Sequence, residues 1–447
     1  MELVLFIIYL LVWLGLTLRR KRTEGYFSVF FVFGLSGLAY FSLIPMEMYL
    51  TGEEYYFVHY WVKLGSIERN LILFMSIISL FGFYIGLKLS RYHLFPAETD
   101  LVHDDIRPNK GYFAWIIGLL SIVIITCGMI LILFYRELLL SQYDYTSAYR
   151  ITYESPLYSF IKMHFLIGLA LMAGVLMRKR YSWVGMTFCL VIVALIVLAG
   201  MLTADKEPIL LAMLTCASFL KFERIRFKKF IVMTLLGSMC VLVAVTSFNI
   251  YRTHIPIGDI ISKFPWSTIP FTRLDPGGPM VSISSVLSDD YLQLSYGSTY
   301  LNSLGVLIPR LLWPGRPVDL SEEFARDNIG DWSIGRGLGY SPLAEAYVNF
   351  HIPGAFIHFF IFGLLIGGLL RVLRKQVLIK YGFLHIPFIY IVAYYIVIIS
   401  FRASIISPIK MVMMFMIPYC ILFMMIIFFS KVARESNRNN VMLSANT

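Results

Sequence analysis

Two arginines in a proline-rich segment are the first candidates for chemistry in this chain. Arg310 and Arg316 lie in the sequence IPRLLWPGRP, in which three prolines restrict the backbone. Because a guanidinium is planar and carries parallel N–H donors, arginines held in this way suit the oxygens of a phosphate or diphosphate. The same residues also fit a membrane surface, with Trp313 among the headgroups and the arginines extending beside it. Spacing alone leaves both roles open.

A carboxylate follows in the sequence GRGLGYSPLAEAYVNF, residues 335–350. Its three glycines predict a pliant loop, and Ser341 followed by Pro342 predicts a helix start with Ser341 as the N-cap. Exposed amides at such a start favour an anion, with Arg336 close by in the sequence. Glu345 falls one place beyond the capping-box position. It could act as a general base for a hydroxyl nucleophile, or it could simply be favoured by the helix dipole.

Other basic residues could join these two motifs if the fold brings them together. Pairing with a nearby acid explains each of them alone, whereas several around one cavity would bind an anionic lipid headgroup. These further candidates are Arg150, Lys162, Lys206, Arg252, Arg273 and Arg402. His254 and His351 are lone histidines that could serve as bases. The chain has no P-loop, GxSxG, HExxH or dinucleotide motif and no Cys/His cluster, so no cofactor and no metal are expected.

The elements that must position these residues are membrane helices. The chain has 447 residues, of which 58% are hydrophobic and 15% charged, and its mean hydropathy is +0.75. A soluble domain cannot bury that much apolar surface, whereas lipid can. Runs of about 20 apolar residues predict an all-α polytopic membrane protein with about eleven transmembrane helices. They cover residues 2–18, 25–49, 70–89, 112–134, 157–177, 182–202, 208–220, 231–249, 353–370, 383–400 and 411–429.

Charge sets the expected orientation. If the N-terminus lies outside, the predicted cytoplasmic segments hold about 23 of the 38 Lys and Arg residues and about 7 of the 27 Asp and Glu residues. The inside then carries about +16 and the outside about −5, which is the positive-inside pattern. The net charge of +11 is therefore a topology signal, and no nucleic-acid partner is expected. The first run has its basic residues after it, so we expect a retained helix and not a secretory signal.

This topology divides the chain into three parts. Residues 1–249 form an N-terminal transmembrane bundle of about eight helices, and residues 250–352 form one large external loop. Residues 353–447 hold the last helices and a cytoplasmic tail. A loop of about a hundred residues is too long for a mere connection, and both motifs lie in it.

In this setting the motifs resemble a known family, the oligosaccharide repeat-unit polymerases, also called Wzy-type O-antigen or capsule polymerases. In that family a Pro-Arg-x-x-Trp-Pro-like element precedes a Gly/Ser-rich turn and a Glu-x-Tyr-x-Asn-Phe-Gly-like helix start. The general arrangement covers most of the chain, and the motifs cover residues 308–350. His351 stands where the family has Gly. Lys206, in LTADKEPILLAML, stands where related polymerases and ligases commonly have Arg.

The resemblance implies a C-type glycosyltransferase fold and a membrane glycosyltransferase activity. The growing glycan on undecaprenyl diphosphate would be transferred to the non-reducing-end hydroxyl of a new lipid-linked repeat unit. The product is O-antigen or capsular polysaccharide, made at the outer face of the bacterial cytoplasmic (inner) membrane. The sugar-diphosphate bond supplies the energy, so no cofactor is needed. Besides the lipid-linked oligosaccharide and membrane lipid, the resemblance implies a chain-length regulator and a flippase as partners.

The resemblance also implies roles for the site residues. Glu345 would deprotonate or orient the acceptor hydroxyl, and Arg310 would stabilise the charge that develops on the diphosphate leaving group. The residues expected to bind the substrate are Arg316, Arg336, Arg273 and Lys206, with Arg402 and Arg150 across the cavity.

Two other functions stay open on the sequence. An O-antigen ligase would use the same lipid donor but transfer the glycan to lipid A core, and His254 would have to serve as its loop histidine. A polysaccharide-lipid flippase or transporter would show internal repeats and paired broken helices, and the sequence has no visible repeat. A purely structural membrane protein would not need these arginines and a glutamate in one external loop.

Overall fold

The fold is known from a computed structural model. It describes residues 1–24, 28–52, 55–57, 60–62, 64–90, 121–131, 133, 161, 164, 165, 168, 277–289, 292–305, 308, 312, 313, 315–328, 339–378, 386–407, 409, 410 and 413. Four of the described helices are long and apolar enough to cross a membrane: Glu2–Arg20, Val29–Thr51, Ser66–Leu89 and Pro342–Arg371. The protein is therefore a mainly helical membrane protein.

These four helices match four of the predicted spans. Of the fourth predicted span, residues 112–134, the described part is the apolar helix Ser121–Leu131. The predicted spans at 182–202, 208–220 and 231–249 lie outside the described residues, as does nearly all of 157–177 and 411–429.

The N-terminal elements come first in the chain. They are α1 (Glu2–Glu24), α2 (Val29–Gly37), the π-helix η1 (Leu38–Ser42), α3 (Leu43–Thr51), β1 (Tyr55–Phe57), β2 (Tyr60–Val62) and α4 (Ser66–Leu89). The C-terminal elements are α13 (Gly277–Leu287), α14 (Ser298–Gly305), α15 (Leu320–Asn328), α16 (Pro342–Leu378), α17 (Ile386–Ile399) and the 3-10 helix η3 (Ser400–Arg402). The antiparallel pair β1 and β2 is the only sheet among the described residues.

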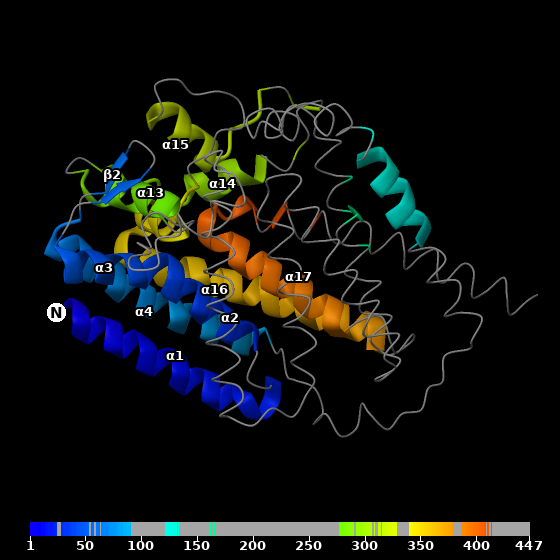
Figure 1. Ribbon diagram of the computed structural model, residues 1–447, viewed down its shortest axis with the longest axis horizontal. Helices are drawn as coiled ribbons and strands as arrows, with labels where there is room; N and C mark the ends of the chain where they lie inside the picture. Colours follow the sequence, from blue (N-terminus) through cyan, green and yellow to red (C-terminus); the bar gives the residue numbers. More distant parts are fainter. Residues whose placement is uncertain are drawn as a thin grey trace, which may run out of the picture.

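The short elements gather at one end of the helix bundle. We call the hairpin, α13, α14 and α15 together the head. Figure 1 shows the long helices side by side, with the head at the end where α1 and α16 begin. Within the head, α13 contacts both strands, and α13 and α14 are separate helices. Contacts of α13 and α14 with α16 join the head to the bundle.

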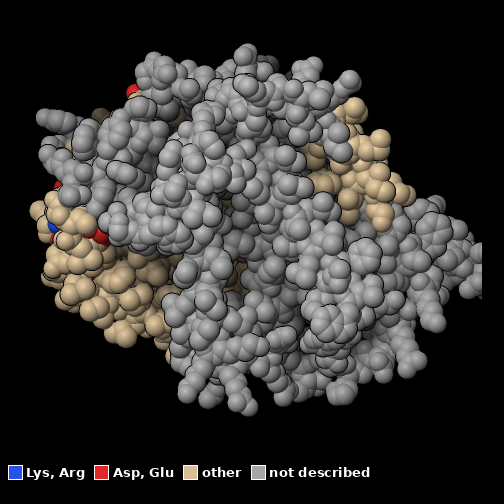
Figure 2. Space-filling model, viewed as in Figure 1, with Lys and Arg blue, Asp and Glu red and all other residues tan. Residues whose placement is uncertain are grey.

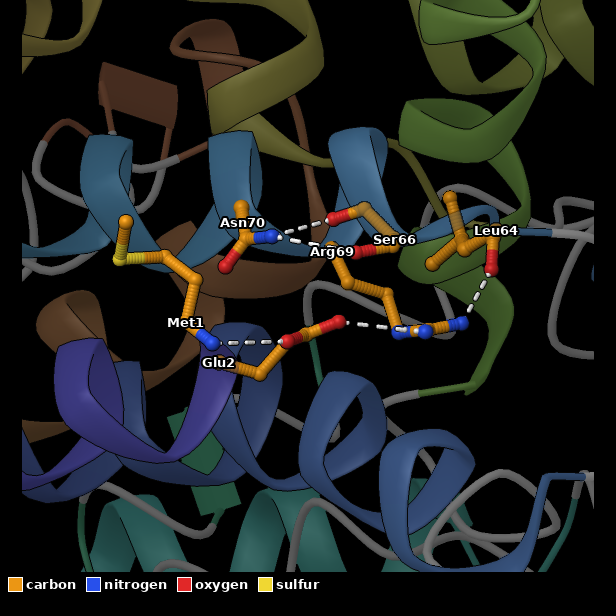
Figure 3. A network of polar contacts seen from close by, with 6 residues as sticks. All are labelled: Met1, Glu2, Leu64, Ser66, Arg69 and Asn70. Atoms are coloured by element: carbon orange, nitrogen blue, oxygen red, sulfur yellow. Dashed lines mark hydrogen bonds and ion pairs between the residues drawn. The ribbon is translucent and has the colours of Figure 1, made fainter.

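A polar network fixes α1 against α4 at the head end (Figure 3). The Arg69 guanidinium pairs with the buried Glu2 carboxylate at 3.2 Å and donates to the Leu64 carbonyl oxygen at 2.7 Å. The Met1 amino group lies 3.4 Å from the other Glu2 carboxylate oxygen. Because Glu2 and Arg69 each lie near the start of their helix, α1 and α4 run in the same direction.

The closest packing in the bundle is between α4 and α16, and it depends on glycine. A Cβ atom on Gly82 would lie 2.6 Å from the Phe356 carbonyl oxygen, and one on Gly363 would lie 2.5 Å from the Phe83 carbonyl oxygen. The two helices thus touch backbone to backbone at Gly82 and Gly86 on α4 and Gly363 on α16, and Gly367, four positions later, makes room for the Ser90 side chain. This is how helices pack closely in lipid, where apolar burial gives little driving force.

Aromatic rings fill the space that these helices and α2 enclose. Phe33 on α2 stacks on Phe83 of α4, with centroids 3.9 Å apart and ring planes 11° apart. The same ring meets the edge of Phe359 on α16 and packs against Phe401 of η3. One buried phenylalanine therefore joins both halves of the chain.

The outer surface of the bundle is apolar. Leu3, Val4, Leu11 and Leu18 of α1 are exposed, and so are Phe74 and Phe81 of α4. Most of the described atoms visible in Figure 2 are likewise uncharged. This is the surface expected of helices that face lipid.

Gly363→Ala is expected to lower the free energy of unfolding by about 1–3 kcal/mol, because the new methyl group would push α4 away. Gly368→Ala in the same helix is the matched control, since a Cβ there meets nothing within 4 Å. This control is expected to leave the free energy of unfolding unchanged, or to raise it by up to about 1 kcal/mol because alanine has a higher helix propensity than glycine. Thermal unfolding of the two purified variants in detergent measures the difference, and equal midpoints would contradict the glycine-mediated contact.

Candidate functional site

A kink divides α16 into two helices and decides where Glu345 lies. Phe350 (φ −144°, ψ 22°) and His351 (φ 52°, ψ −144°) leave the helical conformation, and Pro353 begins the second helix. Residues 352–371 span about 30 Å at 1.5 Å per residue, which matches the hydrocarbon core. The preceding helix, residues 342–350, carries Glu345 and packs against the head.

Glu345 is fully buried, and its two carboxylate oxygens have different surroundings. Oε2 accepts a hydrogen bond of 2.8 Å from the Ile405 backbone N–H. Oε1 is buried and accepts no hydrogen bond among the described residues. No basic side chain in the described part of the chain forms an ion pair with this carboxylate. An unsatisfied buried carboxylate oxygen is costly, so it marks a place where a hydroxyl group, a water or a cation would be stabilising.

Asn349 lies one helical turn after Glu345 and connects it to α14. Its side-chain N–H donates to the Glu345 carbonyl oxygen at 2.7 Å and to the Thr299 hydroxyl at 2.6 Å. Its Oδ1 accepts from the Gly297 N–H at 2.8 Å, and Gly297 has a φ of 89° that favours glycine. All polar atoms of one buried amide are thereby used to hold the start of α14 against α16.

The segment of residues 400–407, which follows α17, closes the other side of Glu345. The Arg402 carbonyl oxygen accepts from the Tyr340 N–H at 3.1 Å. This approach requires a glycine at position 339, because its φ is 78° and a Cβ would lie 3.0 Å from that carbonyl oxygen. The structure therefore explains why glycine is needed at position 339 of the loop.

A second carboxylate holds the same segment. Asp319 accepts from the Ser404 hydroxyl at 3.1 Å through Oδ2, and from the Ser321 N–H at 3.0 Å through Oδ1. It thus caps the start of α15 and positions Ser404 at the same time. Because Ser404 and Ile405 are neighbours, Asp319 and Glu345 bind adjacent residues of the segment 400–407.

Two phenols flank the carboxylate, the half-buried Tyr300 and the buried Tyr340. Burial, and then the charge of Glu345, raise the pKa of both above the ordinary value. Both phenols therefore keep their protons even at a pH at which an exposed tyrosine loses its own. The Tyr300 hydroxyl lies 3.1 Å from Nδ1 of the buried His358, which is in the spanning part of α16.

The structure brings two of the predicted site residues together. Glu345 and Arg402 share this site, Arg402 through its backbone. Arg316 lies in the head, where its Nη1 donates to the Ile308 carbonyl oxygen at 2.8 Å and so closes the turn of residues 308–316. The other predicted site residues lie outside the described residues: Arg150, Lys206, Arg273, Arg310 and Arg336. Of the two lone histidines, His254 also lies outside them, and His351 is exposed at the kink with its ring edge-on to Tyr347.

One local prediction was only half right. The Ser341 carbonyl oxygen accepts the first helical bond, from the Glu345 N–H at 3.0 Å, so the helix begins where expected. However, the Ser341 hydroxyl is buried without a hydrogen-bond partner among the described residues and does not cap the helix. The Ser341 backbone N–H donates to the Ser282 hydroxyl at 2.8 Å, and this bond holds the start of the helix against α13.

Sequence reasoning missed several residues of this site. Asn349 was visible as a polar residue four positions after Glu345, a spacing that puts both on one helix face. Asp319 and Ser404 gave no signal, because they lie 85 residues apart and only the fold joins them. No group of three metal-ligating side chains forms in the described part of the chain. Comparisons of the chain with protein-family models, curated proteins and solved structures find no match.

His351→Gly is expected to stabilise the protein by about 1 kcal/mol, since a positive φ with this ψ strains any residue that carries a Cβ. His351→Ala is the control, because alanine keeps the Cβ and hence the strain. Denaturation of both variants, purified in the same detergent, gives the comparison. A glycine variant that is no more stable than the alanine variant would mean that the kink is not strained.

Proposed function

We propose that this chain is a membrane glycosyltransferase that polymerises lipid-diphosphate-linked oligosaccharide repeat units into O-antigen or capsular polysaccharide. The observation that carries the proposal is the buried Glu345 carboxylate beside the start of a membrane span, with one oxygen fixed by Ile405 and the other without a partner among the described residues. A general base for a sugar hydroxyl needs such an oriented, water-excluded oxygen.

In the proposed reaction the acceptor hydroxyl donates a hydrogen bond to Glu345 Oε1. The ionised form of Glu345 takes this proton as the hydroxyl oxygen bonds to the anomeric carbon of the growing glycan. The bond from that carbon to the lipid diphosphate breaks, and the diphosphate leaves with its electron pair. Because Oε1 is buried, the segment of residues 400–407 or α14 must move aside for the acceptor to reach it.

The negative charge on the departing diphosphate requires fixed cations. We assign this role to Arg310 and Arg316, helped by Arg336, Arg273 and Lys206, and give Arg402 and Arg150 a supporting role. The bond from Arg316 to Ile308 supports the assignment, because it restricts the guanidinium to one orientation. Arg402 belongs to the segment that donates to Glu345, which supports its place near the reacting groups.

Two backbone features support the resemblance to repeat-unit polymerases. His351 stands where that family has Gly, and its φ of 52° is a conformation that glycine adopts most readily. The Gly-rich turn before the helix contains Gly339, whose φ of 78° and close approach to Arg402 also require glycine. At both positions the backbone adopts a conformation that glycine favours, which supports the resemblance.

The proposal includes eleven spans, a C-type fold and an external head in a bacterial inner membrane. The helix directions support the span count. α4 starts at the head end and α16 starts there again, so an odd number of crossings must separate them, and the five predicted spans satisfy this. α17 returns to the head, since Tyr340 and Arg402 bond there.

The test is a gene deletion in the host, complemented with the wild type and variants, with surface polysaccharide resolved on a gel. Deletion is expected to remove the ladder of chain lengths and leave a single repeat unit on its acceptor. Loss of the single repeat as well would indicate a ligase or flippase. An unchanged ladder would overturn the proposal and leave transport as the better function.

Glu345→Gln separates catalysis from structure, because a glutamine oxygen can still accept from the Ile405 N–H. We expect polymer formation to fall roughly 10²- to 10⁴-fold in this variant, and Arg310→Ala and Glu345→Ala to abolish the ladder with normal membrane insertion. Glu322→Gln is the matched control, since Glu322 pairs with Arg326 on the surface of α15. If Glu345→Gln were fully active while Glu345→Ala was not, Glu345 would be a positioning residue.

A further inference from the structure

The helix α14 exposes both of its leucines and buries the hydroxyl of Ser303. Thr299 bonds to Asn349 on the inner side, and Ser303 is buried. On the outer side Leu301 is 70% exposed and Leu304 is 51% exposed. A helix at a water-facing surface normally buries its leucines and exposes its hydroxyls. Ser298 and Asn302 are exposed as well. The outer side of α14 therefore presents two leucines beside polar groups, a mixture that suits the boundary between lipid and water.

The turn after α14 extends this surface. We define the apolar patch as the exposed Tyr296, Leu301, Leu304, Ile308, Leu312 and Trp313. The bond from Arg316 to the Ile308 carbonyl oxygen closes the turn and keeps a cation at the edge of the patch. Aromatic rings and an arginine bordering leucines are the combination found at the boundary between lipid tails and headgroups.

The depth of α14 fits the same boundary. Its residue Tyr300 reaches His358, and Gly297 and Thr299 bond to Asn349 just before the kink. His358 lies six residues into the spanning part of α16, about 9 Å along the helix axis. The base of α14 is therefore level with the outermost turns of the span, where lipid and water meet.

The rest of the head does not share this property. α15 buries Ala325 and exposes the Glu322–Arg326 ion pair, as a water-facing helix should. In Figure 1, α14 lies closer to the long helices and α15 lies farther out. Among the head residues whose side chains the structure describes, the exposed apolar ones thus lie on α14 and in the segments next to it, and none lies on α13 or α15.

We propose that the apolar patch is embedded in the leaflet of the bilayer on the head's side, with α14 acting as an interfacial helix. The apolar patch thus contacts membrane lipid and not a second protein. The inner side of the same helix holds Asn349 and so the Glu345 helix, which couples the depth of α14 in the leaflet to the geometry of the candidate site. This inference does not depend on the proposed reaction.

The test uses single cysteines in a variant whose five native cysteines are replaced by alanine, labelled with an environment-sensitive fluorophore. Leu301→Cys and Leu312→Cys probe the patch, and Leu11→Cys on α1 reports the lipid interior. Asp327→Cys on the exposed side of α15 is the water-facing control. Each labelled protein is placed in phosphatidylcholine/phosphatidylglycerol nanodiscs, with brominated lipids as lipid quenchers and iodide as the aqueous quencher.

At positions 301 and 312 we expect lipid quenching at least threefold stronger than at 327, strongest for bromines near the headgroup. Equal behaviour of 301, 312 and 327 would place the patch in water and overturn the proposal. Protection of 301 and 312 from both quenchers would mean that protein covers the patch, which would also overturn it. Two independent probe positions guard against a local effect of one substitution.

Discussion

The close backbone contact of α4 with α16 is the constraint on which the rest of the structure depends. In lipid, apolar side chains gain little by packing together, so two helices hold each other chiefly where their backbones approach. The glycines of both helices permit that approach. It fixes the register of α16, and the register determines which residues face the aromatic core and how far the Glu345 helix stands above the span.

From this contact the structure builds outward in two directions. Toward the bundle, Phe33, Phe83, Phe359 and Phe401 share one core, so α2 and η3 are placed by the same pair of helices. Toward the head, the kink at His351 redirects the chain and lets Asn349 bind α14. A strained backbone at this point is consistent with a functional constraint, since strain persists only where surrounding contacts enforce it.

The candidate site combines segments that are distant in sequence. Glu345 is 60 residues from Ile405, and Asp319 is 85 residues from Ser404. Carboxylates from two separate segments therefore hold one short stretch of backbone between them. An arrangement of this kind keeps a buried carboxylate oriented through one oxygen, while the other has no hydrogen-bond partner among the described residues.

The sequence by itself determined the membrane environment, the described spans and the start of the helix that carries Glu345. These are local properties: hydropathy over about 20 residues, and turn and capping chemistry over a few. Tertiary structure alone decided that Ser341 docks on Ser282 instead of capping its helix, that Asn349 holds α14, and that Ile405 binds Glu345. Those outcomes depend on which distant backbone groups come within hydrogen-bond reach, and no local pattern encodes that distance.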